Sequence, residues 1–434
     1  MEKLTIEIWV GNQWHECCVI EIDNAYQGGF GSSTLSYDTD FVFNGQNSPV
    51  SLRFPVNLHE VRLANWPSFL FDLIPQGKGR HYLLGELKLA DGPAADWPLI
   101  CAGAFNPIGR LRVKEALAFY KNHSNKSNVI TPLSGFSIQD ILERKDDFIE
   151  HLYVHGMLSA GTSGVQGVAP KFMLTLGKDK LWYADGAIED IYAQKHYLIK
   201  LPRGRDSSDI KILRNEAAFI RTASALGLFV EEIPLLQEDM LFIPRFDRKV
   251  TQSGVERLHQ ESAASLVGQI GFDQRPSQNE LLAALRRHVT DKTATTIEFI
   301  KRDILNLAMG NTDNHARNTA IQIVDGIIQL SPLFDFAPMN LDKEGIARAL
   351  RWRNKEKNNV ELSNWVDVLT SLDIEKNELP VITDALHSFG QSIEGLADIM
   401  AQQGVDSDII ENRYYAIQTQ IKQLRELKVG GNYG

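Results

Sequence analysis

The sequence predicts an α+β protein of two or three domains, and three observations lead to that prediction. The chain has 434 residues, and a domain commonly holds about 100–200. Strand-like alternation and turn signals fill the first part, whereas the pattern after residue 255 is mainly helical. Hydrophobic residues make up 43% of the chain and charged residues 23%, which is enough apolar material for a buried core.

The first region, residues 1–130, is predicted to be a β-rich subdomain. Leu4–Val10 alternates apolar and polar residues at the period of a strand, and Asn44–Gly45 is a turn signal. The polar, unpatterned stretch 121–128 indicates a linker, and a helix is expected over 138–154.

The second region, residues 131–250, mixes strands with one clear helix. Strands are expected at Lys171–Leu176 and at His196–Leu201, and two more near 233–236 and 240–243. Between them a helix begins at the capping residues Ser207, Ser208 and Asp209 and ends at Gly227.

The third region, residues 251–434, is predicted to be mainly helical. A helix is expected directly before the polar run 310–318. Its apolar face consists of Ile297, Ile300, Ile304 and Ala308. The final helix carries a second apolar face, which we interpret as core packing, at Ile410, Tyr414, Ile417, Ile421 and Leu424.

Composition excludes several classes of protein. The formal charge of −10 disfavours binding of nucleic acid over the whole surface, and the basic segment 348–357 is interpreted as a solvated face rather than a phosphate contact. No apolar run approaches the ~20 residues of a membrane span, and no secretory leader is visible. Three cysteines without zinc-site spacing argue against a disulfide framework and predict a reducing, cytoplasmic location.

The polar run 310–318 carries the most specific chemistry. Asp313 and Asn318 form a D-x-x-x-x-N pattern, and Asp335 follows in Leu333-Phe-Asp335. Phosphoryl transfer needs a carboxylate to accept the hydroxyl proton, and an amide oxygen and a second carboxylate to hold Mg²⁺. These three residues occur in that order and spacing.

The upstream sequence supplies the other half of a phosphate site. Gly161–Gly164, continuing to Gly167, is a candidate phosphate loop, Lys200 ends a strand, and Glu216 on the next helix is placed to pair with Lys200. Each feature alone has an ordinary explanation, such as a turn or a solvated strand edge. Their common order predicts a bilobal, protein-kinase-like fold.

Two further sets have weaker cases. His315 is placed to orient Asp313 or the neighbouring backbone. Arg245 and Asp247 either lie at a hinge between lobes or form an internal ion pair that bridges to the catalytic loop. No Ser-His-Asp set and no H-E-x-x-H motif supports hydrolase chemistry.

Over nearly its whole length the chain resembles the HipA family of serine/threonine kinase toxins from type II toxin-antitoxin systems. The segments that carry this resemblance are Ser163–Gln166 with Pro170–Phe172, His196–Pro202, Arg245–Arg248, Gln260–Glu261, Asn311–Asn318 and Leu333–Asp335. Trp66–Gly77 and Gly103–Arg112 resemble the family's first subdomain.

The resemblance implies a protein kinase that uses ATP and Mg²⁺, phosphorylates an aminoacyl-tRNA synthetase and arrests growth. It implies a HipB-like helix-turn-helix antitoxin as partner, with operator DNA bound mainly through that antitoxin. By motif position, Asp313 would be the catalytic base, Asn318 and Asp335 the Mg²⁺ ligands, and Lys200 a phosphate contact. The implied ATP-binding residues are Gly161, Ser163, Gly164, Val165, Gln166, Lys171, Lys200, Phe246, Gln260 and His315.

One departure from the family concerns regulation. The family's phosphate loop begins with a serine that is autophosphorylated; here Gly161 takes that place, Ser163 remains as the candidate, and Gly167–Ala169 is inserted before Pro170. Two alternative functions stay open: a catalytically weak kinase-fold binding module in an antitoxin–DNA repressor complex, and a small-molecule kinase.

Overall fold

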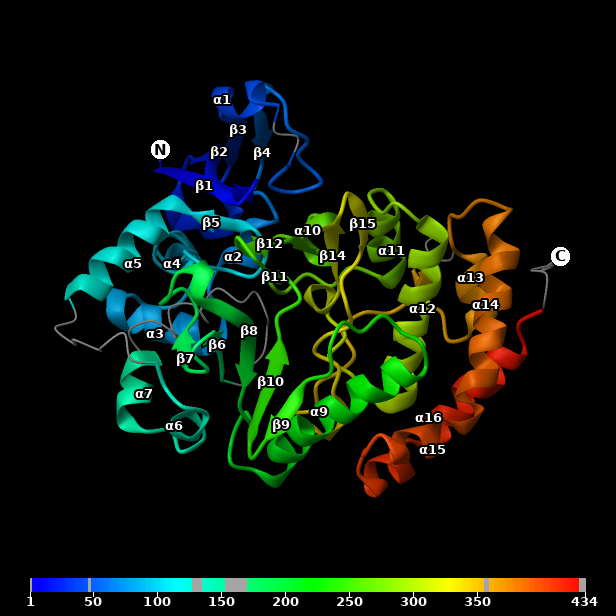
Figure 1. Ribbon diagram of the computed structural model, residues 1–434. Helices are drawn as coiled ribbons and strands as arrows, with labels where there is room; N and C mark the ends of the chain where they lie inside the picture. Colours follow the sequence, from blue (N-terminus) through cyan, green and yellow to red (C-terminus); the bar gives the residue numbers. More distant parts are fainter. Residues whose placement is uncertain (1, 46–47, 127–134, 153–169, 355–358, 429–434) are drawn as a thin grey trace. The chain divides into compact units, whose positions relative to one another are not determined.

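The chain forms two compact units in the computed structural model, which describes residues 2–45, 48–126, 135–152, 170–354 and 359–428. The first unit comprises Met1–Arg203 and Met240–Gln274, and the second comprises Gly204–Asp239 and Arg275–Gly434 (Figure 1). Helices and antiparallel sheets occur together, as the α+β prediction requires. The three-part division at residues 130 and 250 stays a prediction.

The first unit begins with a five-stranded antiparallel sheet in the order β4-β3-β2-β1-β5. Its strands are β1 (Glu2–Val10), β2 (Gln13–Ile22), β3 (Ser33–Tyr37), β4 (Val61–Leu63) and β5 (Leu111–Val113). The alternation predicted for β1 is confirmed, because Leu4, Ile6 and Ile8 are fully buried on one face.

Helices that the sequence pattern did not indicate complete this core. They are α1 (Thr39–Phe43), α2 (Leu70–Leu73), α3 (Gly77–Leu87), α4 (Asp96–Gly103) and α5 (Lys114–Lys126). The linker predicted over 121–128 was wrong as far as residue 126, because α5 continues through it. Ala116, Leu117 and Tyr120 anchor α5 on the apolar core, so its last turns remain helical although they are polar.

A second antiparallel sheet in this unit contains neighbouring strands in the order β7-β6-β8-β10. Their bounds are β6 (Lys171–Gly177), β7 (Trp182–Ala184), β8 (Ala193–Lys200) and β10 (Met240–Pro244). The helix expected over 138–154 is instead α6 (Ile138–Leu142) and α7 (Asp146–His151), separated by Arg144 in a left-handed conformation at φ 50°. Ile141 of α6 and Phe148 of α7 pack into the apolar cluster of this sheet.

Short strands interrupt the helical pattern that was expected after residue 255. In the first unit the chain continues through β11 (Arg248–Thr251), β12 (Gly254–Arg257), β13 (His259–Ser262) and α10 (Ala263–Val267). In the second unit β14 (Ala320–Val324) and β15 (Ile327–Leu330) pair as an antiparallel hairpin. Segments of four or five residues are too short to show a decisive period in the sequence, so these strands were missed.

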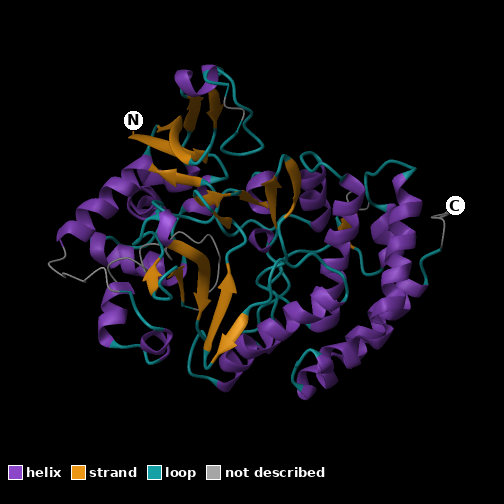
Figure 2. Cartoon of the chain, viewed as in Figure 1, coloured by secondary structure: helices purple, strands orange, loops and turns teal. Residues whose placement is uncertain are grey.

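The second unit is built mainly of helices. They are α9 (Ser207–Ala225), α11 (Gln278–Arg286), α12 (Lys292–Met309), α13 (Trp365–Thr370), α14 (Glu378–Ser392), α15 (Leu396–Gln402) and α16 (Ser407–Arg425). Its other strands are β9 (Leu235–Gln237), β16 (Arg353–Asn354) and β17 (Val360–Glu361). Figure 2 shows α12, α14 and α16 as helices packed side by side. No described helix is long and apolar enough to cross a membrane.

The face of α16 that meets the core differs from the predicted one by a small rotation. Ile417, Ile421 and Leu424 are buried as expected, but Tyr414 is 54% exposed, and in the first turn Ile409 is buried rather than the predicted Ile410. Because a helix has 3.6 residues per turn, the buried positions shift gradually around its axis. In the first turn the buried residue is therefore the neighbour of the predicted one.

Candidate functional site

The polar run 310–318 is a loop that begins where α12 ends. Asp291 caps the start of α12, and Gly310 ends it in a left-handed conformation at φ 90°. A side chain at position 310 would begin 2.4 Å from Oδ1 of Asn340. Glycine is therefore required there both for the backbone angle and for space, and the loop leaves the helix in one direction.

Three residues predicted from the sequence meet within this loop. The side-chain amide of Asn318 donates a hydrogen bond to the backbone carbonyl of Asp313 (2.8 Å), and its backbone N–H donates to the carbonyl of His315 (2.9 Å). Nε2 of His315 lies 3.7 Å from Oδ1 of Asp313. The arrangement agrees with the prediction that His315 orients Asp313.

Asp335 and Asn318 line one pocket of the second unit. The lining residues are Gln278, Phe299, Arg302, Asp303, Asn306, Asn311, Asn314, His315, Asn318, Thr319, Leu333, Phe334, Asp335 and Leu350. Asp335 has φ 52°, a backbone angle that is uncommon outside glycine and often found at functional sites.

The pocket presents oxygen atoms suited to a hard cation. Within the described part of the chain, Oδ1 of Asn318 and Oδ1 of Asn311 are buried without a hydrogen-bond partner. No group of three or more His, Cys, Asp or Glu side chains in the described ranges is placed to hold a metal. The donor set that Asn318 and Asp335 offer is thus a mixture of amide and carboxylate oxygens, which Mg²⁺ accepts.

Asp303 is a residue of this pocket that the sequence analysis missed. It projects from α12, is 2% exposed, and accepts hydrogen bonds from Arg348 (2.6 and 2.7 Å), from Nε1 of Trp352 (2.7 Å) and from the amide of Gln278 (3.0 Å). Arg348 belongs to the basic segment that we interpreted as a solvated face, and the structure shows it in a buried ion pair instead.

Residues 349–350, which follow the Arg348 that Asp303 binds, in turn hold the loop 310–318 in place. Oδ1 of Asn314 accepts hydrogen bonds from the backbone N–H groups of Ala349 (3.1 Å) and Leu350 (3.2 Å), and its amide donates to the carbonyl of Leu350 (3.2 Å). A connected series of contacts therefore runs from α12 through Arg348 and residues 349–350 to the residue next to Asp313. A sequence gives no signal for it, because the partners are 35 or more positions apart.

The predicted phosphate-binding lysines lie in the first unit. Lys171 begins β6 and Lys200 ends β8, where the two residues are direct partners across the strands. Both side chains are buried. Lysine is a residue type that commonly contacts phosphate, and the phosphate contact of these two lysines stays a prediction.

The other predicted site residues either lie elsewhere in the two units or fall outside the described residues. Phe246 occupies the turn between β10 and β11, and Gln260 lies on β13 with its Oε1 buried and, within the described residues, unpartnered. Glu216 is buried in α9, and its pairing with Lys200 stays a prediction. The remaining loop candidates, Gly161, Ser163, Gly164, Val165 and Gln166, lie outside the described residues together with the inserted Gly167–Ala169.

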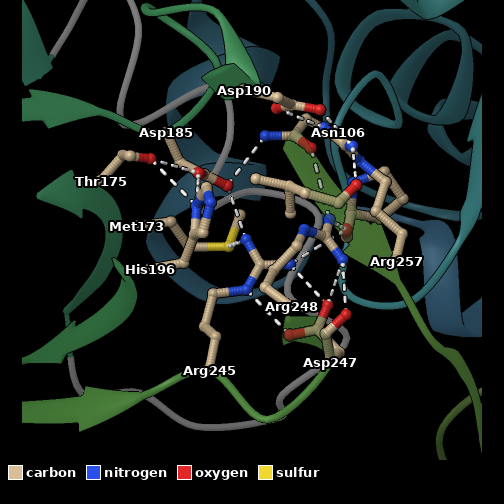
Figure 3. A network of polar contacts seen from close by, with 12 residues as sticks. Asn106, Met173, Thr175, Asp185, Asp190, His196, Arg245, Asp247, Arg248 and Arg257 are labelled. Atoms are coloured by element: carbon tan, nitrogen blue, oxygen red, sulfur yellow. Dashed lines mark hydrogen bonds and ion pairs between the residues drawn. The ribbon is translucent and has the colours of Figure 1, made fainter. Parts of the chain in front are cut away.

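A buried network of charges includes Arg245 and Asp247, the two neighbours of Phe246 in sequence (Figure 3). Arg245 binds Asp247 (2.7 Å) and Asp185 (2.5 Å), and Arg248 binds Asp247 (2.5 Å). All four side chains are 2% exposed. Arg245 and Asp247 thus form an ion pair, and the two positive and two negative charges balance, whereas a bridge from this pair to the loop 310–318 stays a prediction.

Electrostatics in this network favour the ionised carboxylates. Burial by itself would raise the pKa of Asp185, but Arg245 and a hydrogen bond from His196 hold that pKa well below its usual range. The pKa of Asp247 is lowered in the same way, against burial, by Arg245 and Arg248. The carboxylates consequently remain charged at neutral pH although they are inaccessible to water.

Comparisons with known proteins agree with this architecture. Over 98% of its length the chain superposes on all of a chain in the HipA, HipB and operator DNA complex of the Shewanella oneidensis MR-1 toxin-antitoxin system. The TM-score is 0.65 and the sequence identity 16%, so the likeness concerns the fold. It confirms the predicted HipA-like, kinase-type α+β architecture.

Sequence comparison adds one curated relative and one family. The protein named "Putative kinase Y4mE" of Sinorhizobium fredii is 28% identical over 130 residues, which is 28% of this chain and 31% of that protein. The chain therefore spans about a third of the length of that relative. The family model described as HipA-like C-terminal domain matches residues 163–393, more than half of the chain. By this match, the chain belongs to the family with a HipA-like C-terminal domain.

Proposed function

We propose that the protein is an ATP- and Mg²⁺-dependent kinase that phosphorylates serine or threonine hydroxyls of a protein substrate. The observation that carries this proposal is the loop in which Asn318 holds the carbonyl of Asp313, together with an unpartnered buried oxygen on Asn318 and with Asp335 in the same pocket. These are the groups that phosphoryl transfer needs, in the order known for kinases.

Asp313 is the group that accepts the proton. As the hydroxyl oxygen of the substrate bonds to the γ-phosphorus and the bond to ADP breaks, its proton moves to the Asp313 carboxylate. The side chain is partly exposed, which leaves it accessible to a substrate, while Asn318 and His315 hold its loop and carboxylate in place.

Asn318 and Asp335 would hold Mg²⁺. Their oxygen atoms fit this ion because they are hard donors and because Oδ1 of Asn318 has no competing partner among the described residues. When bound, Mg²⁺ neutralises charge on the phosphate oxygens of ATP. Lys171 and Lys200, neighbours at the end of their sheet, would contact phosphate groups of ATP.

The partners follow from the family. The structurally similar Shewanella protein is found with HipB and operator DNA, which supports a HipB-like antitoxin and DNA contact through it. We propose an aminoacyl-tRNA synthetase as substrate, growth arrest as consequence and the cytoplasm as location. Ser163 is the proposed autophosphorylation site, and intact-mass analysis of purified protein would detect the added phosphate.

The decisive experiment compares Asp313→Asn with the wild type and with Asp398→Asn, an exposed aspartate of the same unit. Radiolabelled transfer from ATP should fall ~10²–10⁴-fold in Asp313→Asn, since base catalysis contributes that much, and stay unchanged in Asp398→Asn. Calorimetry should show that both variants still bind ATP. Undiminished transfer in Asp313→Asn would disprove the proposed role of Asp313.

A further inference from the structure

The loop 106–110, which precedes β5 of the N-terminal sheet, reaches the buried charge network beside Phe246. We propose that this loop positions Phe246 and Gln260 for the base of ATP, and that Asn106 is a positioning residue that sets nucleotide affinity and base preference. The inference rests on the proposed function, and it assigns to the N-terminal subdomain a part in nucleotide binding.

The first contact of the loop is with the residues that flank Phe246. The backbone N–H of Gly109 donates to Oδ2 of Asp247 (2.8 Å), and Arg248 donates to the carbonyls of Gly109 (2.7 Å) and Pro107 (2.9 Å). Asp247 is therefore held by the loop and by two arginines at once. Phe246, directly before it, has little freedom to rotate its backbone.

The backbone on both sides of Phe246 is also fixed within the unit. The N–H of Arg245 donates to the carbonyl of His196 (2.9 Å), and the N–H of Leu258 donates to the carbonyl of Asp247 (3.0 Å). Phe246 is partly buried between these anchors. These hydrogen bonds fix the backbone from which the Phe246 side chain projects.

The second contact of the loop is with Gln260. Gly109 has φ 89°, and a side chain there would begin 3.4 Å from the carbonyl oxygen and 3.5 Å from the nitrogen of Gln260. The backbone of the loop thus lies against the backbone of Gln260, whose Oε1 is buried without a described partner. The same five-residue loop supports both candidate nucleotide contacts.

These two residues have the chemistry that recognises adenine. An aromatic ring stacks on a nucleobase, and a carboxamide oxygen accepts a hydrogen bond from an exocyclic amine. Adenine presents an amine at the position where guanine presents a carbonyl. A displaced Gln260 would therefore reduce the preference for ATP over GTP.

Asn106 connects the loop to the rest of the network. Its amide donates to Oδ2 of Asp185 (2.8 Å), the carboxylate that also binds Arg245 and His196 (Figure 3). Removing the amide leaves Asp185 with one donor fewer and loosens the loop, which then keeps its contacts with Arg245, Asp247 and Arg248. The effect should travel to Phe246 through Arg245, which binds Asp185 and Asp247 together.

The test measures nucleotide binding of Asn106→Leu in the full chain. The matched control is Asn57→Leu, because Asn57 belongs to the same unit and the contacts of its side chain are local, a donation to the carbonyl of Pro55 (2.9 Å) and an acceptance from the backbone N–H of His59 (2.8 Å). Calorimetry with ATP and with GTP, steady-state kinetics and a thermal melt are recorded for each. We expect about tenfold weaker ATP binding, a raised KM with kcat within twofold, and a smaller ratio of ATP to GTP affinity in Asn106→Leu alone.

Each possible result of this test either supports or overturns the role proposed for Asn106. A folded Asn106→Leu variant with wild-type ATP affinity and base preference would overturn the inference while leaving the proposed function intact. A wild type that binds no ATP would refute the proposed function itself. If Asn106→Leu does not fold, Asn106→Ser and Gly109→Ala are measured by the same criteria, and unchanged affinity in both folded variants overturns the inference.

Discussion

Asp303 is expected to be a main determinant of stability in the second unit, and Asp303→Asn tests this. Its carboxylate accepts four hydrogen bonds, two from Arg348, one from Trp352 and one from Gln278. The asparagine keeps one acceptor oxygen and places an NH₂ group among donors. Whichever oxygen is replaced, two of the four hydrogen bonds are lost: one of the two from Nη2 of Arg348, and the one from either Trp352 or Gln278.

The magnitude follows from the burial of this ion pair. Breaking a buried pair by removing one charge costs ~3–5 kcal/mol of unfolding free energy. For a unit of roughly 150–250 residues, each kcal/mol lowers Tm by about 2–4 °C. Asp303→Asn should therefore melt about 6–20 °C below the wild type, and it should also weaken phosphoryl transfer because the support of Asn314 is lost.

The assay is thermal unfolding followed by circular dichroism, with urea unfolding at 25 °C as a second measure. Glu394→Gln is the matched control, since Glu394 and Arg425 form an exposed pair (2.6 Å) in the same unit. Exposed pairs contribute ~0–1 kcal/mol, so this variant should melt close to the wild type. A Tm of Asp303→Asn within about 2 °C of the wild type would refute the reasoning.

Three further predictions concern single positions. Gly310→Ala should lose ~2–4 kcal/mol and Gly326→Ala only ~1–2 in urea unfolding, because both have positive φ but a side chain meets Asn340 only at position 310. Hydrogen bonding to Arg286 lowers the pKa of Glu378 to about 2, against ~4.3 unfolded. The ionised form is thus favoured by folding, so Glu378→Gln should melt below the wild type above pH 5, and the difference should shrink as pH falls towards 3. Asp335→Asn should abolish the Mg²⁺-dependent tightening of ATP binding in calorimetry; equal tightening would remove Asp335 as ligand.

Several elements of this protein could be predicted because the sequence signals for them lie among neighbouring residues. The period of β1 and the start of α9 at Ser207 depend on neighbouring residues, so their patterns survive in the sequence, although the N-cap of α9 is Asp206 rather than one of the predicted residues. The proximity of Asp313 and Asn318 was equally predictable, since only four residues separate them in one loop. The order of the candidate motifs predicted the family that the comparison identified.

The remainder was decided by contacts between distant positions. Asp303 and Arg348 are 45 residues apart, and Asn106 and Asp185 are 79 apart. A buried carboxylate must find donors wherever the fold brings them, and a single chain carries no periodic trace of that choice. The sequence alone thus determined which residues are candidates for the proposed chemistry and in which loop they lie. Only the tertiary structure decided which side chains hold that loop and the turn at Phe246 in place, because that support depends on burial and on partners far along the chain.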